Sequence, residues 1–418
     1  MLKYLITTIF LTLLLFNQVG FTQKALTLEQ CETLFLQRNL VLLASQYNVD
    51  AAKALTIQAK LWDNPYVSVD FNGINPQDGR VLDIGGRGEK GFSIQQLIYL
   101  GKKKQNQVAL SKTNEALAAL DLQDLLRNLK AQLRKSFYTI YFNNKRLETI
   151  DAQIANIETL VQSYAVQAQK GNIALKELVR LQSLLLNFKN ARIEIVNSNL
   201  DEQANLSLLL SSVETIKPIA ADDVFNRYAS LSLSDRAALD TLALNNRPDY
   251  LLARKKIEAN EWNVKWQKSL AIPDLTVGMS YDQHGGAFNN QINFSVGIPI
   301  PVFNKNQGNI QYAETIVKQS QAELQSVSWR LQAEVAAALT KWQTAKDNYN
   351  QLSAATLADF EAVYNGVLQN FQKRNIGILE FTDFMESYNQ MTIQLSEYKK
   401  NVVLSGEALN AILNSKIF

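Results

Sequence analysis

The chain has 418 residues, of which 47% are hydrophobic and 19% charged, with 42 Lys and Arg against 39 Asp and Glu. This balance is too apolar for a disordered chain and too charged for a polytopic helical membrane protein, and the evenly mixed charges offer no patch for nucleic acid. With one His and one Cys, a disulfide framework, a zinc site and a Cys/His nucleophile pair are nearly excluded within one chain. We expect no catalytic site, metal site or cofactor, and therefore not an enzyme.

Residues 1–23 are expected to be a secretory signal peptide. Lys3 supplies the positive start, an apolar run interrupted only by threonines follows over 4–16, and small or polar residues begin at Val19. The run is too short for a comfortable membrane span, although an uncleaved anchor remains the alternative. Cys31 lies too far beyond the run for lipidation. The rest of the sequence has no apolar run of about 18 residues, so we expect an exported chain without a transmembrane helix.

An internal duplication at a spacing of about 200 residues organises the rest of the chain. Arg38 to Ala44 reappears as Arg247 to Ala253, and Lys170-Gly-Asn-Ile173 recurs as Lys373-Arg-Asn-Ile376. Because the matches keep their order, chance is a poor explanation. Each copy is predicted to hold a helix, two strands, a long helix and a further helix.

The boundaries of the two copies follow from these matches. The first structural repeat is expected at 24–213, with a β-hairpin at 65–100. The second is expected at 241–418, with its hairpin at 273–302. The inter-repeat segment 214–240 separates them.

The long helical stretches carry apolar residues at heptad-like steps, which favours coiled-coil packing over a globular two-layer domain. From about Lys104 to Lys170 the first stretch would be ~100 Å long at ~1.5 Å per residue, so it needs neighbours along its whole length. The residues of this predicted seam are Leu122, Leu126, Leu129, Leu133, Phe137, Ile140, Leu147, Ile150, Ile154, Ile157, Val161 and Tyr164 in the first copy, and Val317, Leu324, Val327, Leu331, Val335, Ala338, Trp342, Ala345, Tyr349 and Leu352 in the second.

The predicted strands alternate between apolar and small or polar residues, as strands of a transmembrane barrel do. A soluble sandwich edge gives the same alternation and remains the alternative. The strand that begins near Phe92 changes phase at Gln95-Gln96. Four strands cannot close a barrel in one chain, so closure in lipid would need several protomers. The alternating apolar residues are Val67, Val69 and Phe71 in the first copy, and Leu275, Val277, Met279, Tyr281, Ile292, Phe294, Val296, Ile298 and Ile300 in the second.

An acidic pair follows the second Lys-x-Asn-Ile motif. Glu380 and Asp383 are three residues apart at the start of a predicted helix, so they share one helical face. The ordinary interpretation is favourable placement at the positive end of the helix dipole. A functional interpretation requires a symmetric oligomer, which would turn each carboxylate into a ring.

The chain resembles the TolC family of outer-membrane efflux proteins over nearly its whole mature length. The resemblance rests on Asn246-Arg-Pro-Asp-Tyr250, on Ile272-Pro-Asp-Leu275, on the strand end Gly297-Ile-Pro-Ile-Pro-Val-Phe303 and on the two helix–turn–helix tips. The length and the strand-end pattern are most similar to the heavy-metal (cobalt-zinc-cadmium) efflux branch.

This resemblance implies a mainly α fold with a small β part. Its elements would be a long coiled-coil α-helical barrel in the periplasm and two transmembrane β-hairpins per protomer. Three protomers would together form one twelve-stranded barrel in the outer-membrane lipid. A smaller equatorial region is implied at 214–240, with Pro218 and Asp222-Asp223, and at the C-terminus.

The resemblance also implies a periplasmic gate at the tips. The family's tip has the form Tyr-x-x-Gly-x-x-x-x-x-Asp-x-x-Asp, which places Glu380 and Asp383 on acidic ring positions. Glu177 falls on an acidic family position in the first tip. Phe371 replaces the family's Tyr and Arg374 its Gly, so any hydrogen-bond network at the gate would differ.

The implied function is a passive exit duct in a tripartite efflux system, driven by an inner-membrane pump through a periplasmic adaptor. The alternatives are the outer-membrane component of a type I protein secretion system and a non-conducting coiled-coil rod. The periplasmic adaptor itself would need a lipoyl-type β-domain, which the sequence does not suggest. The residues expected to contact the adaptor are Lys170, Gly171, Asn172, Lys373, Arg374 and Asn375.

Overall fold

The computed structural model describes residues 24–75, 79–86, 88–221, 223–233, 235–285, 287–351 and 354–418. The predicted signal peptide at 1–23, and the predictions that fall on Asp222 and Leu352, lie outside the described residues. The chain is mainly helical with a small β part, as predicted, and divides into two compact units.

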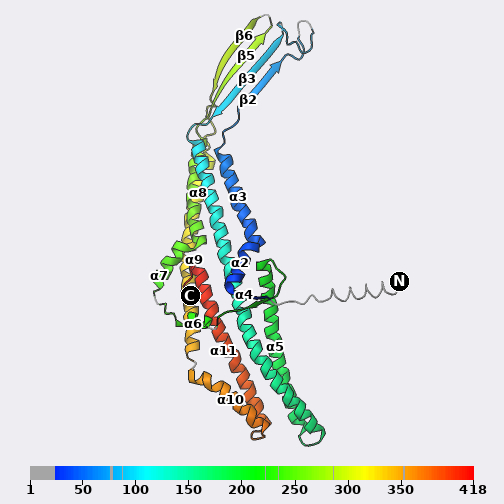
Figure 1. Cartoon of the computed structure of the whole chain (residues 1–418). Helices are drawn as coiled ribbons and strands as arrows, with labels where there is room; N and C mark the ends of the chain where they lie inside the picture. Colours follow the sequence, from blue (N-terminus) through cyan, green and yellow to red (C-terminus); the bar gives the residue numbers. More distant parts are fainter. Residues whose placement is uncertain are drawn as a thin grey trace, which may run out of the picture. The chain divides into compact units, whose positions relative to one another are not determined.

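The sheet unit comprises residues 44–124 and 248–330. Within it, a four-stranded antiparallel sheet extends beyond the ends of the helices (Figure 1). Helices α3, α4 and α9 contribute residues to both units. The strands in sheet order are β2 (Tyr66–Phe71), β3 (Glu89–Ile98), β5 (Leu275–His284) and β6 (Phe288–Gly297), and the helices are α3 (Leu40–Lys60), α4 (Lys103–Gln169), α8 (Pro248–Leu270) and α9 (Gln307–Asn350).

The register gives the sheet one apolar and one polar face. Val67, Ile94, Met279 and Phe294 pair in one row, and the neighbouring row on the other face is Ser68, Ser93, Ser280 and Asn293. The prediction that Phe294 and Val296 share a face is confirmed, since both pair with apolar residues of β5. Gly278 pairs with Gln95 and Ser295 in another row of the polar face, where a Cβ at Gly278 would lie 2.6 Å from Ser295 Oγ, so that position leaves no room for a larger residue.

The change of phase in the sequence at Gln95-Gln96 does not interrupt the strand. Both residues pair in register with β5, and β3 runs unbroken from Glu89 to Ile98. Gln96 lies on the apolar face, where its Nε2 donates to the backbone oxygens of Asp63 and Leu97, each at 3.0 Å. These bonds satisfy a polar side chain on an apolar face, and they explain why the alternation is lost in the sequence but kept in the backbone.

The helical unit comprises the described parts of 1–43, 125–247 and 331–418. It contains the ends of α4 and α9 and most of the shorter elements. The α4 helix is 67 residues long, so the predicted long helix is confirmed. The remaining elements are β1 (Lys24–Leu26), α2 (Leu28–Arg38), α5 (Leu175–Leu210), β4 (Ile216–Pro218), α6 (Val224–Ser230), α7 (Arg236–Asn246), α10 (Ala354–Gln372) and α11 (Ile378–Leu413).

The long helical stretch of the second copy is divided, unlike that of the first copy. It forms two helices, α9 and α10, which end and begin at Asn350 and Ala354. The seam residues before this point behave as expected, since Leu331, Val335 and Trp342 are buried.

The sequence analysis also missed a two-stranded parallel ladder in which β1 pairs with β4, Lys24 opposite Ile216. Gln203 of α5 fixes this ladder, because its amide oxygen accepts from Ile216 N at 3.1 Å and its amide nitrogen donates to Ile216 O. The beginning of the first repeat and the inter-repeat segment are thereby joined.

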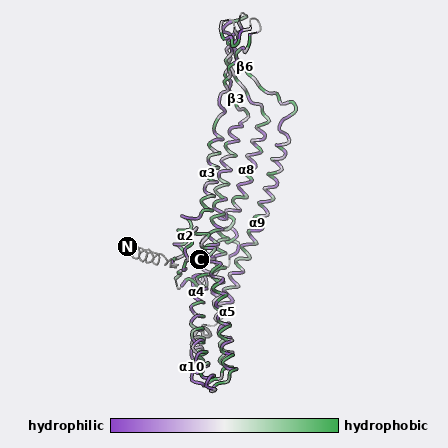
Figure 2. The backbone as a smooth tube through the Cα atoms, turned by 90° about the vertical axis from the view of Figure 1, so that its right-hand side faces the viewer, coloured by the Kyte–Doolittle hydropathy of each residue, from purple (hydrophilic) through white to green (hydrophobic). Residues whose placement is uncertain are grey.

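Hydrophilic and hydrophobic stretches alternate along the helices of both units (Figure 2). Among the residues that the structure describes, no helix combines the length and the apolar character needed to cross a membrane.

Candidate gate and helical tips

The two tips of the helical unit have the same backbone conformation. After α4, Gly171 N donates to Ala168 O at 3.0 Å and Asn172 N to Gln167 O at 2.9 Å. After α10, Arg374 N donates to Phe371 O at 3.0 Å and Asn375 N to Asn370 O at 2.8 Å. This pattern is the Schellman motif, which ends a helix by placing one residue in the left-handed region. Gly171 and Arg374 occupy that position, with φ of 74° and 62°.

A side-chain bond repeats in both tips. Asn172 Nδ2 donates to Gln167 Oε1 at 2.8 Å, and Asn375 Nδ2 donates to Asn370 Oδ1 at 3.0 Å. We call these two bonds the amide clamps. They give the Asn of the repeated Lys-x-Asn-Ile motif a structural role, which the sequence analysis missed although the recurrence of Asn was visible.

Aromatic rings pack against one another in the helices that lead into the second tip. Phe371 stacks on Phe381 with centroids 4.0 Å apart, and Tyr164 of the first copy stacks on Phe371 at 5.7 Å. Phe371 and Phe381 belong to a buried apolar cluster drawn from α4, α5, α10 and α11. The ring of Phe371, where the family has Tyr, is therefore a packing element that holds the tips of both copies together.

The predicted gate residues lie at the start of the two returning helices. Glu177 is in the first turn of α5 and is half-buried, whereas Glu380 is in the first turn of α11 and is exposed. Asp383 is exposed one turn later. Neither Glu380 nor Asp383 has a hydrogen-bond or ion-pair partner among the described residues. Both are free to face solvent or a second copy of the chain.

The predicted adaptor-contact residues are all exposed, and the turns that carry them lie at the same end of the helical unit (Figure 1).

An electrostatic interaction with Tyr164 links the two turns. Burial raises the pKa of Tyr164, the charge of Glu177 raises it further, and the charge of Arg374 lowers it. Residues of both tips therefore act on one phenol.

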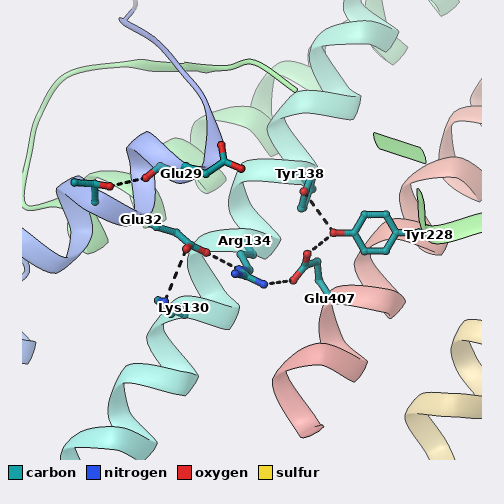
Figure 3. Close-up of polar contacts among 8 residues, drawn as sticks. Glu29, Glu32, Lys130, Arg134, Tyr138, Tyr228 and Glu407 are labelled. Atoms are coloured by element: carbon teal, nitrogen blue, oxygen red, sulfur yellow. Dashed lines mark hydrogen bonds and ion pairs between the residues drawn. The ribbon is translucent and has the colours of Figure 1, made fainter. Parts of the chain in front are cut away.

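The sequence analysis missed a second polar cluster, which lies away from the tips (Figure 3). Arg134 of α4 donates through Nε to Glu32 Oε1 at 2.6 Å and through Nη1 to Glu407 Oε2 at 2.9 Å. Tyr228 of α6 donates its hydroxyl proton to Glu407 Oε1, and the hydroxyls of Tyr138 and Tyr228 are 3.5 Å apart. The cluster ties α2, α6 and α11 to α4.

This cluster is structural in character. Burial lowers the pKa of Arg134, but the carboxylates of Glu407 and Glu32 outweigh it and hold the guanidinium charged. Burial and the neighbouring Glu407 raise the pKa of Tyr228, which stays neutral. Removing one partner of such a buried set leaves an uncompensated charge, which strongly destabilises a fold.

Other reactive groups are scarce in the described part of the chain. Within it, no three His, Cys, Asp or Glu side chains gather closely enough to hold a metal ion. Cys31 is free and buried on α2, and burial raises the pKa of its thiol to about 11. A thiol in that state is mostly protonated at neutral pH and unreactive.

Comparison with known proteins identifies the relatives of this chain. Residues 239–415 match the family described as "Outer membrane efflux protein". The cobalt-zinc-cadmium resistance protein CzcC of Cupriavidus metallidurans is 23% identical over 373 residues, which cover 88% of this chain and 85% of that protein.

Solved structures give the same result for the fold. A crystal structure of CusC, from a study of its folding and transmembrane channel formation, superposes on this chain with a TM-score of 0.75 at 18% identity. The match covers 96% of this chain and 95% of that one. The outer membrane protein VceC of Vibrio cholerae superposes with a TM-score of 0.72 at 16% identity, covering 93% and 96%. At these identities the likeness establishes the fold, and the predicted fold class is confirmed.

Proposed function

We propose that this chain, which resembles the outer membrane efflux proteins as its sequence predicted, is the outer-membrane exit duct of a tripartite efflux system. It would conduct solutes passively from the periplasm to the exterior. Its partners would be two further copies of itself, a periplasmic adaptor and an energised inner-membrane pump.

The observation that carries this proposal is the open four-stranded sheet. One face is apolar and suits lipid, the other is polar and suits a water-filled lumen. Its edge strands, β2 and β6, each pair with a strand on one side only, and among the described residues their outer edges have no strand partner. An open edge is not tolerated in lipid, and three copies of four strands would close a twelve-stranded barrel. This arrangement supports a homotrimer in the outer membrane.

The tips support a gate and a docking surface at the periplasmic end. In a threefold assembly, Glu380 and Asp383 would each be present three times near the axis. Carboxylate rings favour cations and repel anions. Glu177 would add charge from the first tip. The exposed turns at 170–172 and 373–375 would contact the adaptor.

The cargo proposed first is divalent metal cations, because the relative CzcC is a cobalt-zinc-cadmium resistance protein. A passive duct needs no resident metal site for such a cargo. Growth of a deletion strain on cobalt, zinc and cadmium salts, compared with growth on drugs and detergents, tests this choice. Sensitivity confined to drugs would contradict it.

The duct itself is tested by the assembly and conductance of the purified chain. We expect a trimer in detergent, with heat-sensitive mobility, that conducts ions in planar bilayers. A monodisperse monomer that retains its β-content would contradict the trimer. A trimer without conductance would favour the structural rod, and export of a protein substrate would favour type I secretion.

A further inference from the structure

A cavity of about 480 Å³ lies in the helical unit between α4, α6, α10 and α11, away from both tips. Each of its four helices contributes an aromatic side chain to the walls: Tyr141 and Phe142 from α4, Phe225 from α6, Phe360 from α10 and Tyr388 from α11. Cavities of this size with aromatic walls and a few polar groups are typical of small-molecule sites.

Two polar side chains in this cavity have hydrogen-bonding atoms without a partner. Gln153 is 3% exposed, and within the described part of the chain neither its Nε2 nor its Oε1 makes a hydrogen bond. Arg146 Nε is buried and equally unpartnered. Both side chains line the cavity from α4, where their separation of seven residues places them on one helical face. Buried polar groups nearly always have partners, so this set needs an explanation.

The cavity is also positively charged. Its lining includes Lys145, Arg146 and Lys399, and no Asp or Glu among the described residues that line it. Lys145 has Glu148 at 3.8 Å on the exposed side of α4. Arg146 Nη1 has Glu397 at 3.9 Å, but this carboxylate is much closer, at 2.7 Å, to Lys400. Arg146 is therefore only weakly compensated.

We propose that this cavity binds a small amphipathic anion, with a flat aromatic body, one carboxylate and a hydroxyl or N–H donor. The aromatic walls would take the body of the ligand. The carboxylate would accept from Arg146 Nε and Gln153 Nε2, and the ligand's donor would bond to Gln153 Oε1. Each unpartnered atom then gains a partner of the correct polarity. The proposal is independent of the duct function, because it concerns one protomer and no conductance.

The test uses the full chain in lipid nanodiscs and 3-amino-2-naphthoate as a fluorescent probe, with empty nanodiscs as a blank. The amino group of this probe lies beside its carboxylate, so both groups can reach the one amide of Gln153. The neutral carboxamide and the aminomethyl cation of the probe keep the same aromatic body. Anisotropy titrations should give the anion at least about tenfold tighter binding than the carboxamide, and the cation weaker still. Equal affinities across this charge series would overturn the proposal.

Variants locate the site. Arg146→Gln should weaken binding of the anion by about tenfold and Gln153→Leu by about fivefold, the scale of lost charged and neutral hydrogen bonds. Arg192→Gln is the matched control, because Arg192 lies on α5 and pairs with Asp151 outside the cavity. Binding unchanged in both cavity variants would overturn the proposal. If Arg146→Gln fails to assemble, Gln153→Leu and the charge series still decide.

Labelling distinguishes a ligand from a covering protein chain. Thr392 lines the cavity, and the native Cys31 is fully buried. Thr392→Cys should react with a maleimide in the free protein and react several-fold more slowly with saturating 3-amino-2-naphthoate. A cysteine that stays unreactive without the probe would mean that a second copy covers the cavity, and would overturn the proposal.

Discussion

The turn after α4 and the turn after α10 make the same backbone hydrogen bonds and the same amide clamp, but they carry different side chains. Gly171 occupies the left-handed position in the first tip and Arg374 in the second. A non-glycine residue is disfavoured there by about 1–2 kcal/mol. Arg374 in the second tip therefore has a backbone cost that Gly171 in the first tip does not have, and it places a long cationic side chain at the turn.

The charges of the returning helices differ in the same way. Both begin with a Glu in the first turn, Glu177 and Glu380. Three residues later the first copy has Arg180 and the second has Asp383. The pair at these two positions is thus neutral in the first copy and acidic in the second. The duplication preserved the backbone and changed the side chains, so gating chemistry is expected mainly in the second copy.

The largest expected effect comes from Phe371, whose counterpart in the first tip is Ala168. Phe371→Ala removes the ring between Tyr164 and Phe381 and should lower the free energy of opening of the second tip by ~3–5 kcal/mol. Hydrogen exchange of the α10 and α11 amides measures this. Leu379→Ala, at an exposed position in the same tip, is the control and should change little.

The acidic pair is tested by ion selectivity. Glu380→Gln with Asp383→Asn should reduce the cation-to-anion permeability ratio several-fold, up to about tenfold, because the carboxylate rings are neutralised. Reversal potentials in a salt gradient measure this ratio. Glu177→Gln should have a smaller effect, since Arg180 already offsets that charge. Identical reversal potentials for the wild type and the double variant would reject the gate and leave simple helix-dipole complementarity.

Exchanging the residues at the left-handed position should change the two tips in opposite directions. Gly171→Arg should destabilise the first tip by ~1–2 kcal/mol, and Arg374→Gly should stabilise the second by a similar or smaller amount. Exchange rates of the turn amides report both changes. A loss of stability in Arg374→Gly would mean that the guanidinium makes a contact worth more than the backbone cost.

The amide clamps should contribute equally to both tips. Asn172→Ala and Asn375→Ala each remove one exposed side-chain hydrogen bond, with an expected loss of ~0.5–1.5 kcal/mol. The backbone bonds of the turn remain. A much larger loss at one tip would show that its Asn contacts something besides the clamp residue.

The smallest effect concerns the phenol shared by the tips. Tyr164 has a raised pKa, so its contribution to stability is present below the unfolded tyrosine pKa of about 10 and is lost as the pH rises through the folded pKa. Glu177→Gln should lower the pKa of Tyr164 and Arg374→Gly should raise it. Tyrosinate absorbance, with Tyr164→Phe subtracted, follows the titration. Shifts of the same sign in both variants would contradict the electrostatic link.

Periodicity predicted the elements that depend on local pattern. Alternation at Val67 and Phe294 identified strands, and heptad spacing identified the 67-residue α4. It failed at Gln96, where a local hydrogen bond satisfies a polar side chain on the apolar face. It also missed the division between α9 and α10, because the predicted seam runs past Asn350, where α9 ends, to Leu352. β1 is three residues long and too short to show a period.

The candidate sites were predictable to different degrees. Glu380 and Asp383 were visible as a spaced pair, and their role as a gate stays a prediction. The amide clamps could have been found from the recurring Asn. The contact between Arg134 and Glu407 joins residues 273 positions apart, and no spacing rule connects them. The same holds for the cavity, since its unpartnered Gln153 is visible only after packing.

The pairing of β1 with β4 and of Glu32 with Arg134 has a consequence for the order of folding. The strand partner of residues 24–26 lies nearly half a chain length later in the sequence, and Glu407, which shares the cluster with Glu32, follows in α11. The entropic free-energy cost of closing so long a loop grows slowly, by ~0.6 kcal/mol for each doubling of its length. This cost arises before the contacts form and can offset it. The N-terminal segment is therefore expected to dock late in folding, after α4, α5 and α11 have largely formed.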